Sequence, residues 1–367
     1  MADVAVVGGG IAGASVAWHL AERDVPVTVY ERGALADETT RKSAAFVGLY
    51  GTETEVAMKR YALRRYNEVL AAPRAAPRHD LVGRLDLATT AAGRRRLRDR
   101  PTGPSPDPVA ELDPADVPEL LVAPALETAA VTAARWRPAV GYVRPRELAR
   151  EFAARAEEAG ATVRTDTTVE DVLVEAGHAE GVVVDGDPVG ADAVVSAAGP
   201  WTPAVARMAG VSVPVRHTLA PVLRLDVDAP ATLPILSHEE SGVYLRGDER
   251  GVLVGVVPGG YDDATERDPG EVPEAVPAGL RETMLDAVTT LTPSLADAPV
   301  AEEWVGVRSH TPDGHPVAGE TAVEDFAVVA FDSSGVQLSP AAADAVARDL
   351  TGASPPPWAD AVSPGRF

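Results

Sequence analysis

The pattern of apolar and polar positions at the start of the chain predicts strand, turn, helix and strand in succession. An apolar run from Val4 to Val7 is followed by three glycines and by an alanine-rich segment, residues 14–23, typical of a helix packed on a sheet. Residues 25–30 predict a second strand, which ends at Glu31. One compact unit of alternating strand and helix therefore occupies the first 31 residues.

The glycines of this unit have the spacing G-x-G-x-x-G at Gly8, Gly10 and Gly13. Gly8 permits a sharp turn, Gly10 lets a pyrophosphate approach the backbone, and Gly13 lets the helix lie close to the strand. The start of the helix offers free N–H groups and the positive end of its dipole to phosphates. Glu31 is placed to accept hydrogen bonds from a ribose hydroxyl. The pattern predicts a bound dinucleotide, and the alternative is a glycine turn without a ligand.

The rest of the chain carries the same signals in two interleaved parts. Helices and strands alternate again from residue 142, whereas residues 215–300 carry alternating strands that indicate an antiparallel sheet. The predicted elements are helices over 53–71, 145–159 and 278–291, strands over 83–88, 161–164, 169–175, 181–184, 193–195, 242–246, 251–256 and 326–330, and a final helix that ends near residue 350. We expect a dinucleotide-binding domain of residues 1–75, 140–214 and 300–352, a second domain of residues 76–139 and 215–299, and a poorly ordered tail of residues 353–367.

The net charge of −22, from 55 acidic and 33 basic residues, argues against nucleic acid as a partner. The acidic residues are spread along the chain, and Lys42 and Lys59 are its only lysines. We expect a solvated acidic surface, which is typical of a halophilic protein, although a GC-rich genome also replaces lysine by arginine. The three arginines at 94–96 are expected on a solvated helix face.

Several kinds of site and location are not expected. The chain has no cysteine, which excludes disulfides, thiolate metal sites and a cysteinyl bond to a cofactor. His310 and His315 flank a turn without further ligands, so we assign no metal. No apolar run approaches the ~18 residues that cross a bilayer, and the first strand begins at residue 4, so we expect a cytoplasmic protein without a membrane span or signal peptide.

Five separated pieces give the chain a resemblance to the D-amino-acid oxidase (DAO) family of FAD-dependent amine oxidoreductases. These pieces are the glycine turn with Glu31, Arg41 to Ala45, Ala197 to Trp201, Trp304 to Arg308, and Gly335 to Pro340. Within the family, the chain looks most like bacterial D-amino-acid dehydrogenases of the D-arginine dehydrogenase type and like glycine oxidase. The resemblance implies an α/β and α+β fold, with a Rossmann-like FAD domain of three layers (ββα) and an interleaved antiparallel-sheet substrate domain.

The resemblance also implies which residues hold cofactor and substrate. A non-covalent FAD would be contacted by Gly8, Gly10, Ile11, Ala12, Gly13, Glu31, Arg32, Arg41, Lys42, Ser43, Ala44, Ala45, Val169, Ala198, Gly199, Trp201, Arg308, Ser334, Gly335, Val336, Gln337 and Leu338. Arg308 matches the arginine that binds the substrate carboxylate, and Tyr244 and Tyr50 match active-site tyrosines. From the residues alone, Arg308 could instead form a structural ion pair, and Tyr244 could belong to the core.

Two departures from the family pattern affect these expectations. Phe46 stands where the D-arginine enzymes have a histidine, and Phe331 and Asp332 replace a pair that often contains glycine. Both positions would lie near the flavin, so the side-chain preference of the substrate site stays open.

The implied reaction is oxidative deamination of a D-amino acid or similar small 2-amino acid by hydride transfer to flavin N5. Hydrolysis of the imino acid then gives a 2-oxo acid and ammonia. We expect a dehydrogenase rather than an oxidase, with the electron acceptor (quinone, another carrier or oxygen) and the oligomeric state open. The alternatives are oxidation of an N-methyl or secondary amino acid such as sarcosine or proline, oxidation of a 2-hydroxy acid, or a non-catalytic FAD-binding protein.

Overall fold

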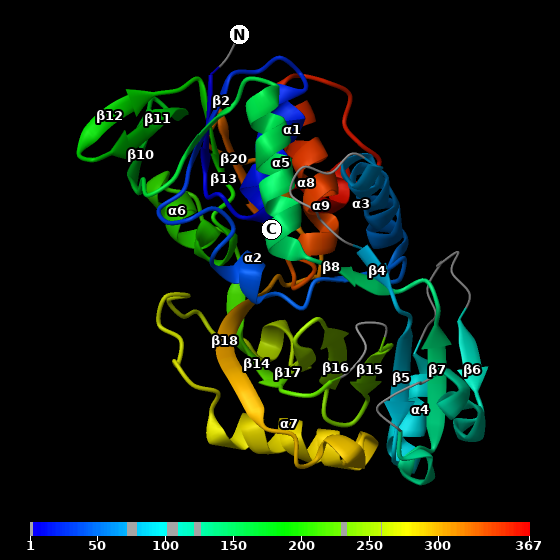
Figure 1. Cartoon of the computed structure of the whole chain (residues 1–367). Coiled ribbons are helices and arrows are strands. Elements are labelled where there is room, and N and C mark those ends of the chain that lie inside the picture. The colour runs from blue at the N-terminus through cyan, green and yellow to red at the C-terminus, as the bar shows by residue number, and fades with distance from the viewer. Residues whose placement is uncertain (1–2, 72–78, 101–108, 121–125, 229–232, 258) are drawn as a thin grey trace.

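The chain folds into an upper domain of sheets and helices above a lower domain that is built on one large sheet (Figure 1). This computed structural model describes residues 3–71, 79–100, 109–120, 126–228, 233–257 and 259–367. The predicted domain boundary near residue 75 lies outside the described residues.

The upper sheet has six strands among the described residues, and all are parallel except the first pair. In spatial order they are β19 (Val317–Glu320), β20 (Phe326–Ala330), β13 (Ala193–Ser196), β1 (Val4–Val7), β2 (Val27–Tyr30) and β9 (Thr162–Arg164). Val4 and Val6 pack into one hydrophobic core, whereas Ala5 and Val7 pack into another on the opposite face. The continuous apolar run of β1 follows from this burial on both faces.

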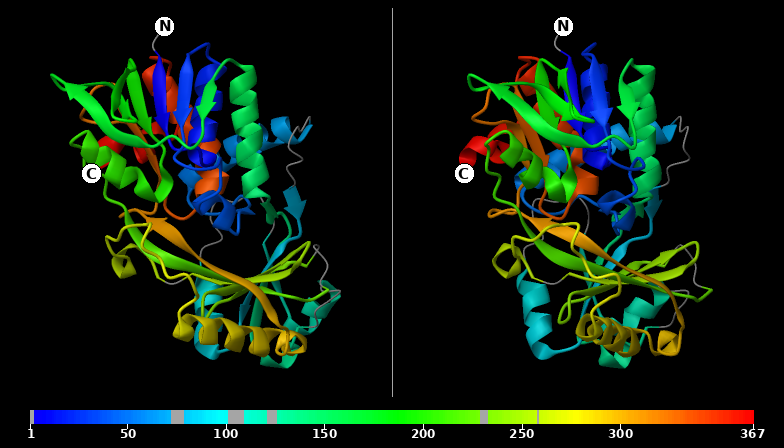
Figure 2. Two further views of the ribbon diagram at one scale, coloured as in Figure 1. Left: turned by 60° about the vertical axis from the view of Figure 1, so that its left-hand side comes forward. Right: turned by 90° about the vertical axis from the view of Figure 1, so that its left-hand side faces the viewer.

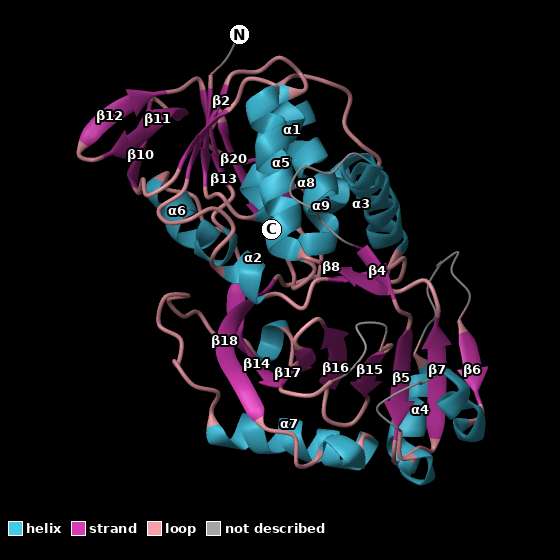
Figure 3. Cartoon of the chain, in the orientation of Figure 1, coloured by secondary structure: helices cyan, strands magenta, loops and turns pink. Residues whose placement is uncertain are grey.

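Helices cover one face of the upper sheet and a small antiparallel sheet covers the other (Figure 3), which confirms the predicted ββα layers. The helices are α1 (Ile11–Ala21), α3 (Glu53–Ala71), α5 (Pro145–Glu158) and α8 (Gly335–Leu350). The opposite layer consists of β10 (Val169–Glu175), β11 (His178–Val184), β12 (Asp187–Gly190) and α6 (Thr202–Met208). None of the helices in the described ranges is long and apolar enough to cross a membrane.

The lower sheet has eight strands within the described part of the chain. In spatial order they are β18 (Val300–His310), β14 (Arg216–Leu225), β17 (Gly251–Val256), β16 (Val243–Asp248), β15 (Ile235–His238), β5 (Arg84–Ala88), β7 (Ala133–Arg137) and β6 (Ala110–Leu112). The pairing is antiparallel except between β15 and β5. Figure 2 shows this sheet between the upper domain and helix α7 (Ala278–Leu291).

Alternating residues give the lower sheet two different faces. Leu85, Leu87 and Leu245 belong to a hydrophobic core that also contains Met284 and Leu291 of α7. The alternate positions of these strands form the polar face of the lower sheet, and Arg308 of β18 lies on the same face. We define the polar face by Arg84, Asp86, Ser237, Tyr244, Arg246 and Arg308.

The remaining elements connect and cover the two domains. A three-stranded sheet of β3 (Phe46–Val47), β8 (Gly141–Val143) and β4 (His79–Leu81) joins the domains. The short helices are α2 (Thr39–Lys42), α4 (Ala91–Asp99), α9 (Ala359–Val362), and the 3-10 turns at Pro114–Leu120, Thr128–Ala130, Gly199–Trp201, Tyr261–Asp263, Pro293–Leu295 and Pro364–Arg366.

The helices predicted over 53–71 and 278–291 are confirmed with the same bounds, and the strand predicted over 83–88 is β5. The segment that begins at residue 300 was expected in the upper domain. Instead, its first eleven residues form β18, which pairs with β14 along the edge of the lower sheet, Arg308 opposite Thr218. Backbone pairing with a strand some 90 residues earlier places this segment, and no local pattern reports such a contact.

The tail of residues 353–367 was expected to be poorly ordered, and this prediction is wrong. Trp358 and Val362 are buried in the same core as α1 and α8. The indole Nε1–H of Trp358 donates to the carbonyl of Ala341 in α8 at 3.0 Å. Two apolar side chains buried against a helix outweigh the proline content that suggested disorder.

Candidate active site

A cavity of about 700 Å³ lies between the upper domain and the polar face of the lower sheet. The upper domain contributes the glycine turn, the loop before β3 and the start of α8, and the lower sheet contributes Ser237, Tyr244 and Arg308. The cavity thus brings together segments that span more than 300 residues of the chain.

The glycine turn has no room for side chains. A Cβ atom on Gly8 would lie 2.7 Å from the carbonyl oxygen of Ala197, and one on Gly13 would lie 1.8 Å from the carbonyl oxygen of Gly8. Gly8 also has φ of +107°, in the region that favours glycine. Helix α1 begins directly after this turn, and its N-cap residue Gly10 has no side chain that could occupy the space in front of the helix. The turn therefore presents backbone to the cavity, as a phosphate site requires.

The carboxylate of Glu31 stands at the end of β2 and is fixed by backbone donors. The N–H of Gly9 donates to one oxygen at 2.7 Å, and the N–H of Gly33 donates to the other at 2.9 Å. Next to it, the guanidinium of Arg32 lies 4.1 Å from the ring centre of Trp201. Glu31, Arg32, Trp201 and Val169 all line this end of the cavity.

The loop before β3 lies against the cavity in a constrained conformation. Ala45 has φ of +53°, which is uncommon for a residue other than glycine. Its N–H donates to the hydroxyl of Ser43 at 3.0 Å, and its carbonyl accepts from the N–H of Val143 at 3.1 Å. These bonds hold Ser43, Ala44 and Ala45 as one wall of the cavity.

The start of α8 forms the facing wall. Ser334, Gly335, Val336 and Gln337 line the cavity. The side-chain oxygen of Gln337 accepts from the N–H of Gly48 at 3.3 Å, which ties α8 to the loop after β3.

Arg308 projects from β18 into the cavity, and no hydrogen bond or ion pair joins its side chain to another described residue. Burial lowers the pKa of its guanidinium, whereas the nearby Tyr244 and Asp332 act in the opposite direction. Arg308 is half-buried, and an arginine in such a position without a carboxylate partner is costly, because its charge has lost part of its water without gaining a counterion. This arrangement favours an anionic ligand at Arg308.

Tyr244 lies beside Arg308 and is 5% exposed. Burial raises the pKa of its hydroxyl although Arg308 and Arg246 oppose the shift, so the group is a neutral donor at pH 7. Its ring packs edge-on against Phe46 at 5.0 Å between ring centres. Gly255 on the neighbouring strand leaves space for it, since a Cβ there would lie 2.2 Å from the tyrosine oxygen.

Tyr50 lines the cavity at the other side of the polar face. The ammonium of Lys59 lies 4.4 Å from its ring centre and donates to its carbonyl at 2.5 Å. The side chain of Arg84 lies near the hydroxyl of Tyr50.

Three of the predicted cofactor residues do not line the cavity. Gly13 lies beneath the turn, Leu338 is buried in the core, and Arg41 is half exposed and paired with Asp37 at 3.3 Å. The other predicted residues that line it are Gly8, Gly10, Ile11, Ala12, Glu31, Arg32, Lys42, Ser43, Ala44, Ala45, Tyr50, Val169, Ala198, Gly199, Trp201, Tyr244, Arg308, Ser334, Gly335, Val336 and Gln337.

Sequence reasoning missed Thr40, Arg84, Asp86 and Ser237, which also line the cavity. The hydroxyl of Thr40 accepts from the N–H of Ile11 at 3.1 Å. A signal for Arg84 and Asp86 was present, because they alternate with Leu85 and Leu87 in a strand that buries its leucines.

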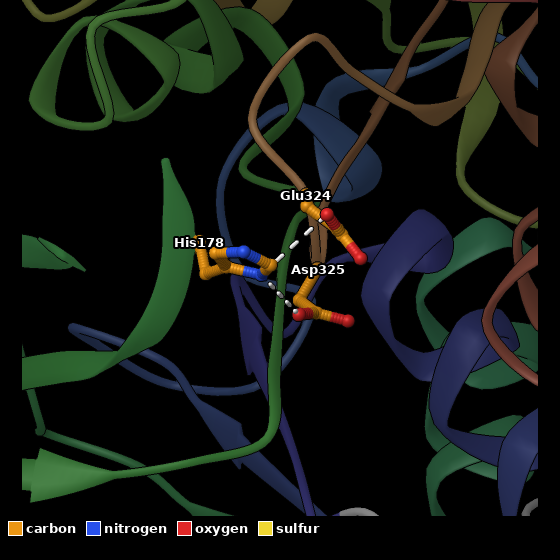
Figure 4. Close-up of side chains that lie close together, drawn as sticks. All are labelled: His178, Glu324 and Asp325. Carbon is orange, nitrogen blue, oxygen red and sulfur yellow. Dashed lines mark hydrogen bonds and ion pairs between the residues drawn. The ribbon is translucent and has the colours of Figure 1, made fainter. Parts of the chain in front are cut away.

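One group of possible metal ligands lies elsewhere (Figure 4). Nδ1 of His178 is 3.6 Å from a carboxylate oxygen of Glu324 and 3.5 Å from one of Asp325. His178 and Glu324 are exposed and face solvent, and the contacts are those of a surface ion pair.

Comparison with known proteins identifies the family. The family model described as "FAD dependent oxidoreductase" (DAO) matches residues 3–348. The chain belongs to this family. The resemblance inferred from five short pieces is confirmed, and FAD is the dinucleotide of this DAO-family protein. Its enzymes act on amino-acid or amine donors.

Individual relatives are identical to this DAO-family chain at between a quarter and a third of the aligned residues. Glycine oxidase from Geobacillus kaustophilus is 29% identical over 360 residues, which cover 92% of this chain and 90% of that protein. D-amino acid dehydrogenase from Agrobacterium fabrum is 31% identical over 172 residues, which cover 47% of this chain and 39% of that protein. Bifunctional protein ThiO/ThiG from a Nostoc species is 30% identical over 218 residues, 58% of this chain, and the match spans 31% of that protein's length.

The fold is also that of a solved structure. L-proline dehydrogenase from P. horikoshii superposes with a TM-score of 0.85 at 22% identity, covering 100% of this chain and 97% of that chain. The residues of the cavity fit FAD, because they supply a turn without side chains, a helix start that opens on the cavity and a fixed carboxylate at the end of β2.

Proposed function

We propose that the protein catalyses FAD-dependent oxidative deamination of a small 2-amino acid, with D-amino acids as the preferred configuration. The observation that carries the proposal is Arg308, a half-buried arginine that faces the cavity without a counterion among the described residues. The preference for the D configuration rests on the similarity to D-amino acid dehydrogenase.

Each polar group has a role in this reaction. The planar fork of Arg308 binds the substrate carboxylate through two parallel hydrogen bonds. The neutral hydroxyl of Tyr244 donates a further hydrogen bond to it, and the packed rings of Tyr244 and Phe46 keep water away from the reacting carbon. FAD supplies the two-electron acceptor for the hydrogen and electron pair of the Cα–H bond. The amine nitrogen lone pair then completes a C=N bond, and water converts this imino acid to a 2-oxo acid and ammonia.

The electron acceptor of the reduced enzyme is proposed to be a quinone or another carrier rather than oxygen. Support comes from the similarity to D-amino acid dehydrogenase. The test is the rate of flavin reoxidation after mixing with air-saturated buffer or with a soluble quinone. Reoxidation by air at the rate of turnover would make the protein an oxidase.

The substrate class is tested by anaerobic titration of the holoenzyme, in high salt, with D-amino acids, L-amino acids, sarcosine, proline and 2-hydroxy acids. Bleaching of the flavin bands by D-amino acids supports the proposal. Bleaching only by sarcosine, proline or a hydroxy acid assigns the alternative substrate class. An oxidised spectrum with every compound would indicate a non-catalytic flavoprotein and overturn the proposal.

The role of Arg308 is tested by Arg308→Met and Arg308→Lys. We expect kcat/KM to fall about 100-fold or more in Arg308→Met, because two charge-assisted hydrogen bonds are lost, and to be partly retained in Arg308→Lys. Arg250→Met is the matched control, since this arginine is 65% exposed and pairs with Glu302 away from the cavity. An unchanged KM for every substrate in Arg308→Met would exclude the carboxylate clamp.

A further inference from the structure

A second arginine of the polar face lies in the same cavity as Arg308. Arg84 comes from β5, and its side chain is 22% exposed, whereas its neighbours Asp86 and Arg137 are 4% and 10% exposed. Arg84 therefore stands between a buried ion pair and the open space of the cavity.

The charges around Arg84 do not cancel. The carboxylate of Asp86 is shared between Arg84, at 2.7 Å, and Arg137, at 3.2 Å. These three residues carry two positive charges and one negative charge. Arg135 on the next strand adds another buried guanidinium, which donates to backbone carbonyls and lies 3.9 Å from the exposed Glu111.

The hydrogen-bonding capacity of Arg84 is only partly used. Its Nε–H donates to Asp86 at 2.7 Å, and the hydroxyl of Tyr50 lies near the guanidinium. A guanidinium has five N–H donors, so the others remain for a ligand. An arginine kept only to neutralise Asp86 would need no contact with the cavity, because Arg137 already neutralises that carboxylate from behind.

Arg84 and Arg308 stand at opposite ends of the substrate side of the cavity. In the lower sheet β18 and β5 are separated by β14, β17, β16 and β15, with Tyr244 between them on β16. Neighbouring strands are about 4.8 Å apart, so the five steps from β18 to β5 separate the two backbones by roughly 24 Å, and the guanidinium of Arg308 extends along this row of strands toward Tyr244 on β16. A ligand that meets both arginines is elongated along the row of strands.

We propose that the substrate is a 2-amino acid with a second carboxylate at the end of its side chain, bound through its α-carboxylate at Arg308 and its terminal carboxylate at Arg84. This inference rests on the proposed function for the reaction, but it can be tested by binding alone. The separation of the two arginines favours glutamate and 2-aminoadipate over aspartate, and over short N-carboxymethyl compounds such as iminodiacetate.

The first experiment measures binding to the oxidised holoenzyme through the shift of its flavin absorption bands. Glutarate and adipate are compared with valerate and hexanoate, which have the same lengths and one carboxylate. We expect at least about 10-fold tighter binding of the dicarboxylates, the effect of one additional charge-assisted hydrogen-bonded pair. Equal affinities for the two series would overturn the proposal.

The variants Arg84→Met and Arg84→Lys locate the effect. We expect Arg84→Met to reduce the dicarboxylate preference to less than about 3-fold, and Arg84→Lys to retain part of it. Arg96→Met is the matched control, since Arg96 is an exposed arginine of α4 that does not line the cavity. If Arg84→Met keeps the preference for dicarboxylates, another group must bind the second carboxylate. If Arg84→Met does not retain FAD, the role of Arg84 is tested by comparing the dicarboxylate preference of the wild type with that of Arg84→Lys.

Flavin reduction separates this proposal from the proposed function. Glutamate and 2-aminoadipate, in both configurations, are compared with glutamine and with norvaline. Faster reduction by the acids supports both proposals. Equal reduction by acids and neutral analogues refutes the second carboxylate site while the deamination stands. Preferential binding of dicarboxylates without reduction by any amino acid refutes the deamination while the anion site at Arg84 stands.

Discussion

The two sides of the cavity are built in different ways. The upper side is made of backbone: Gly8, Gly10 and Gly13 are useful because they have no side chains, and Ala45 contributes through a left-handed backbone conformation. The lower side is made of side chains from alternating positions of separate strands, with Arg308 and Arg84 at its ends. Cofactor and substrate therefore meet a contiguous motif on one side and an assembled surface on the other.

This difference decides how each side responds to substitution. The glycine turn at Gly8, Gly10 and Gly13, which we call the backbone cradle, should lose FAD binding when a side-chain atom is added, because the surrounding backbone has no room to move. An assembled surface can lose or exchange a side chain and keep its shape, so its selectivity changes before its stability does. The predictions below test this contrast from the largest expected effect to the smallest.

Gly13→Ala should damage the cradle most. Its Cβ would lie 1.8 Å from the carbonyl oxygen of Gly8, so helix α1 must move away from β1. Overpacking of this kind costs about 3 kcal/mol, or about 100-fold in FAD affinity if the strain falls on the cofactor site. FAD affinity is measured by reconstitution of the apoprotein. Gly279→Ala is the control, because a Cβ there meets nothing within 4 Å, and equal FAD affinities for the two variants would refute the cradle.

Gly255→Ala should damage the assembled side while the cofactor stays bound. The new Cβ would lie 2.2 Å from the hydroxyl oxygen of Tyr244, so the tyrosine must move from its place beside Arg308. We expect KM to rise about 10-fold, with an unchanged flavin content. Tyr244→Phe removes the hydroxyl without adding volume and should raise KM by less. Loss of FAD from Gly255→Ala would show that the two sides are not independent.

Each side also contains a buried histidine whose pKa is strongly lowered, and both predict acid sensitivity. Burial lowers the pKa of His19 in α1 to about 3 and that of His217 in β14 to about 4, from 6.5. Below pH 6.5 the unfolded chain takes up these protons and the folded chain does not, so stability falls as the pH falls from 6.5 toward 4. The loss is about 1.4 kcal/mol per pH unit for each histidine.

The measurement is urea unfolding at pH 7 and pH 5.5. His19→Gln and His217→Phe should each lose about 1.4 kcal/mol less than the wild type between these two values. The double variant should lose less than either single variant, because the two sites lie in separate domains. A wild type with equal stability at both pH values would show that neither histidine is held neutral by the fold.

The same contrast explains how far the sequence could be interpreted. The glycine turn and Glu31 could be predicted because their residues are adjacent and their spacing is set by one turn and one helix, and the ββα layers followed from the family resemblance. The pairing of β18 with β14 could not, because it depends on a contact between distant strands. Arg84 was passed over for the same reason, since its distance from Arg308 along the chain says nothing of the cavity that they share. The tail was misjudged because two buried side chains, Trp358 and Val362, decide its order.

The alternation of the lower sheet has a consequence for assembly as well as for recognition. If a strand paired one residue out of register, Arg84 or Arg308 would turn toward the apolar core under α7, and Leu85 or Val305 would turn toward the polar face. Burying a guanidinium among leucines without a counterion is prohibitive, so misaligned sheets are penalised as they form. The arginines that select a ligand thus also destabilise wrong registers of the sheet that carries them. A substitution that replaces one of them to alter selectivity would at the same time make a wrong register less unfavourable.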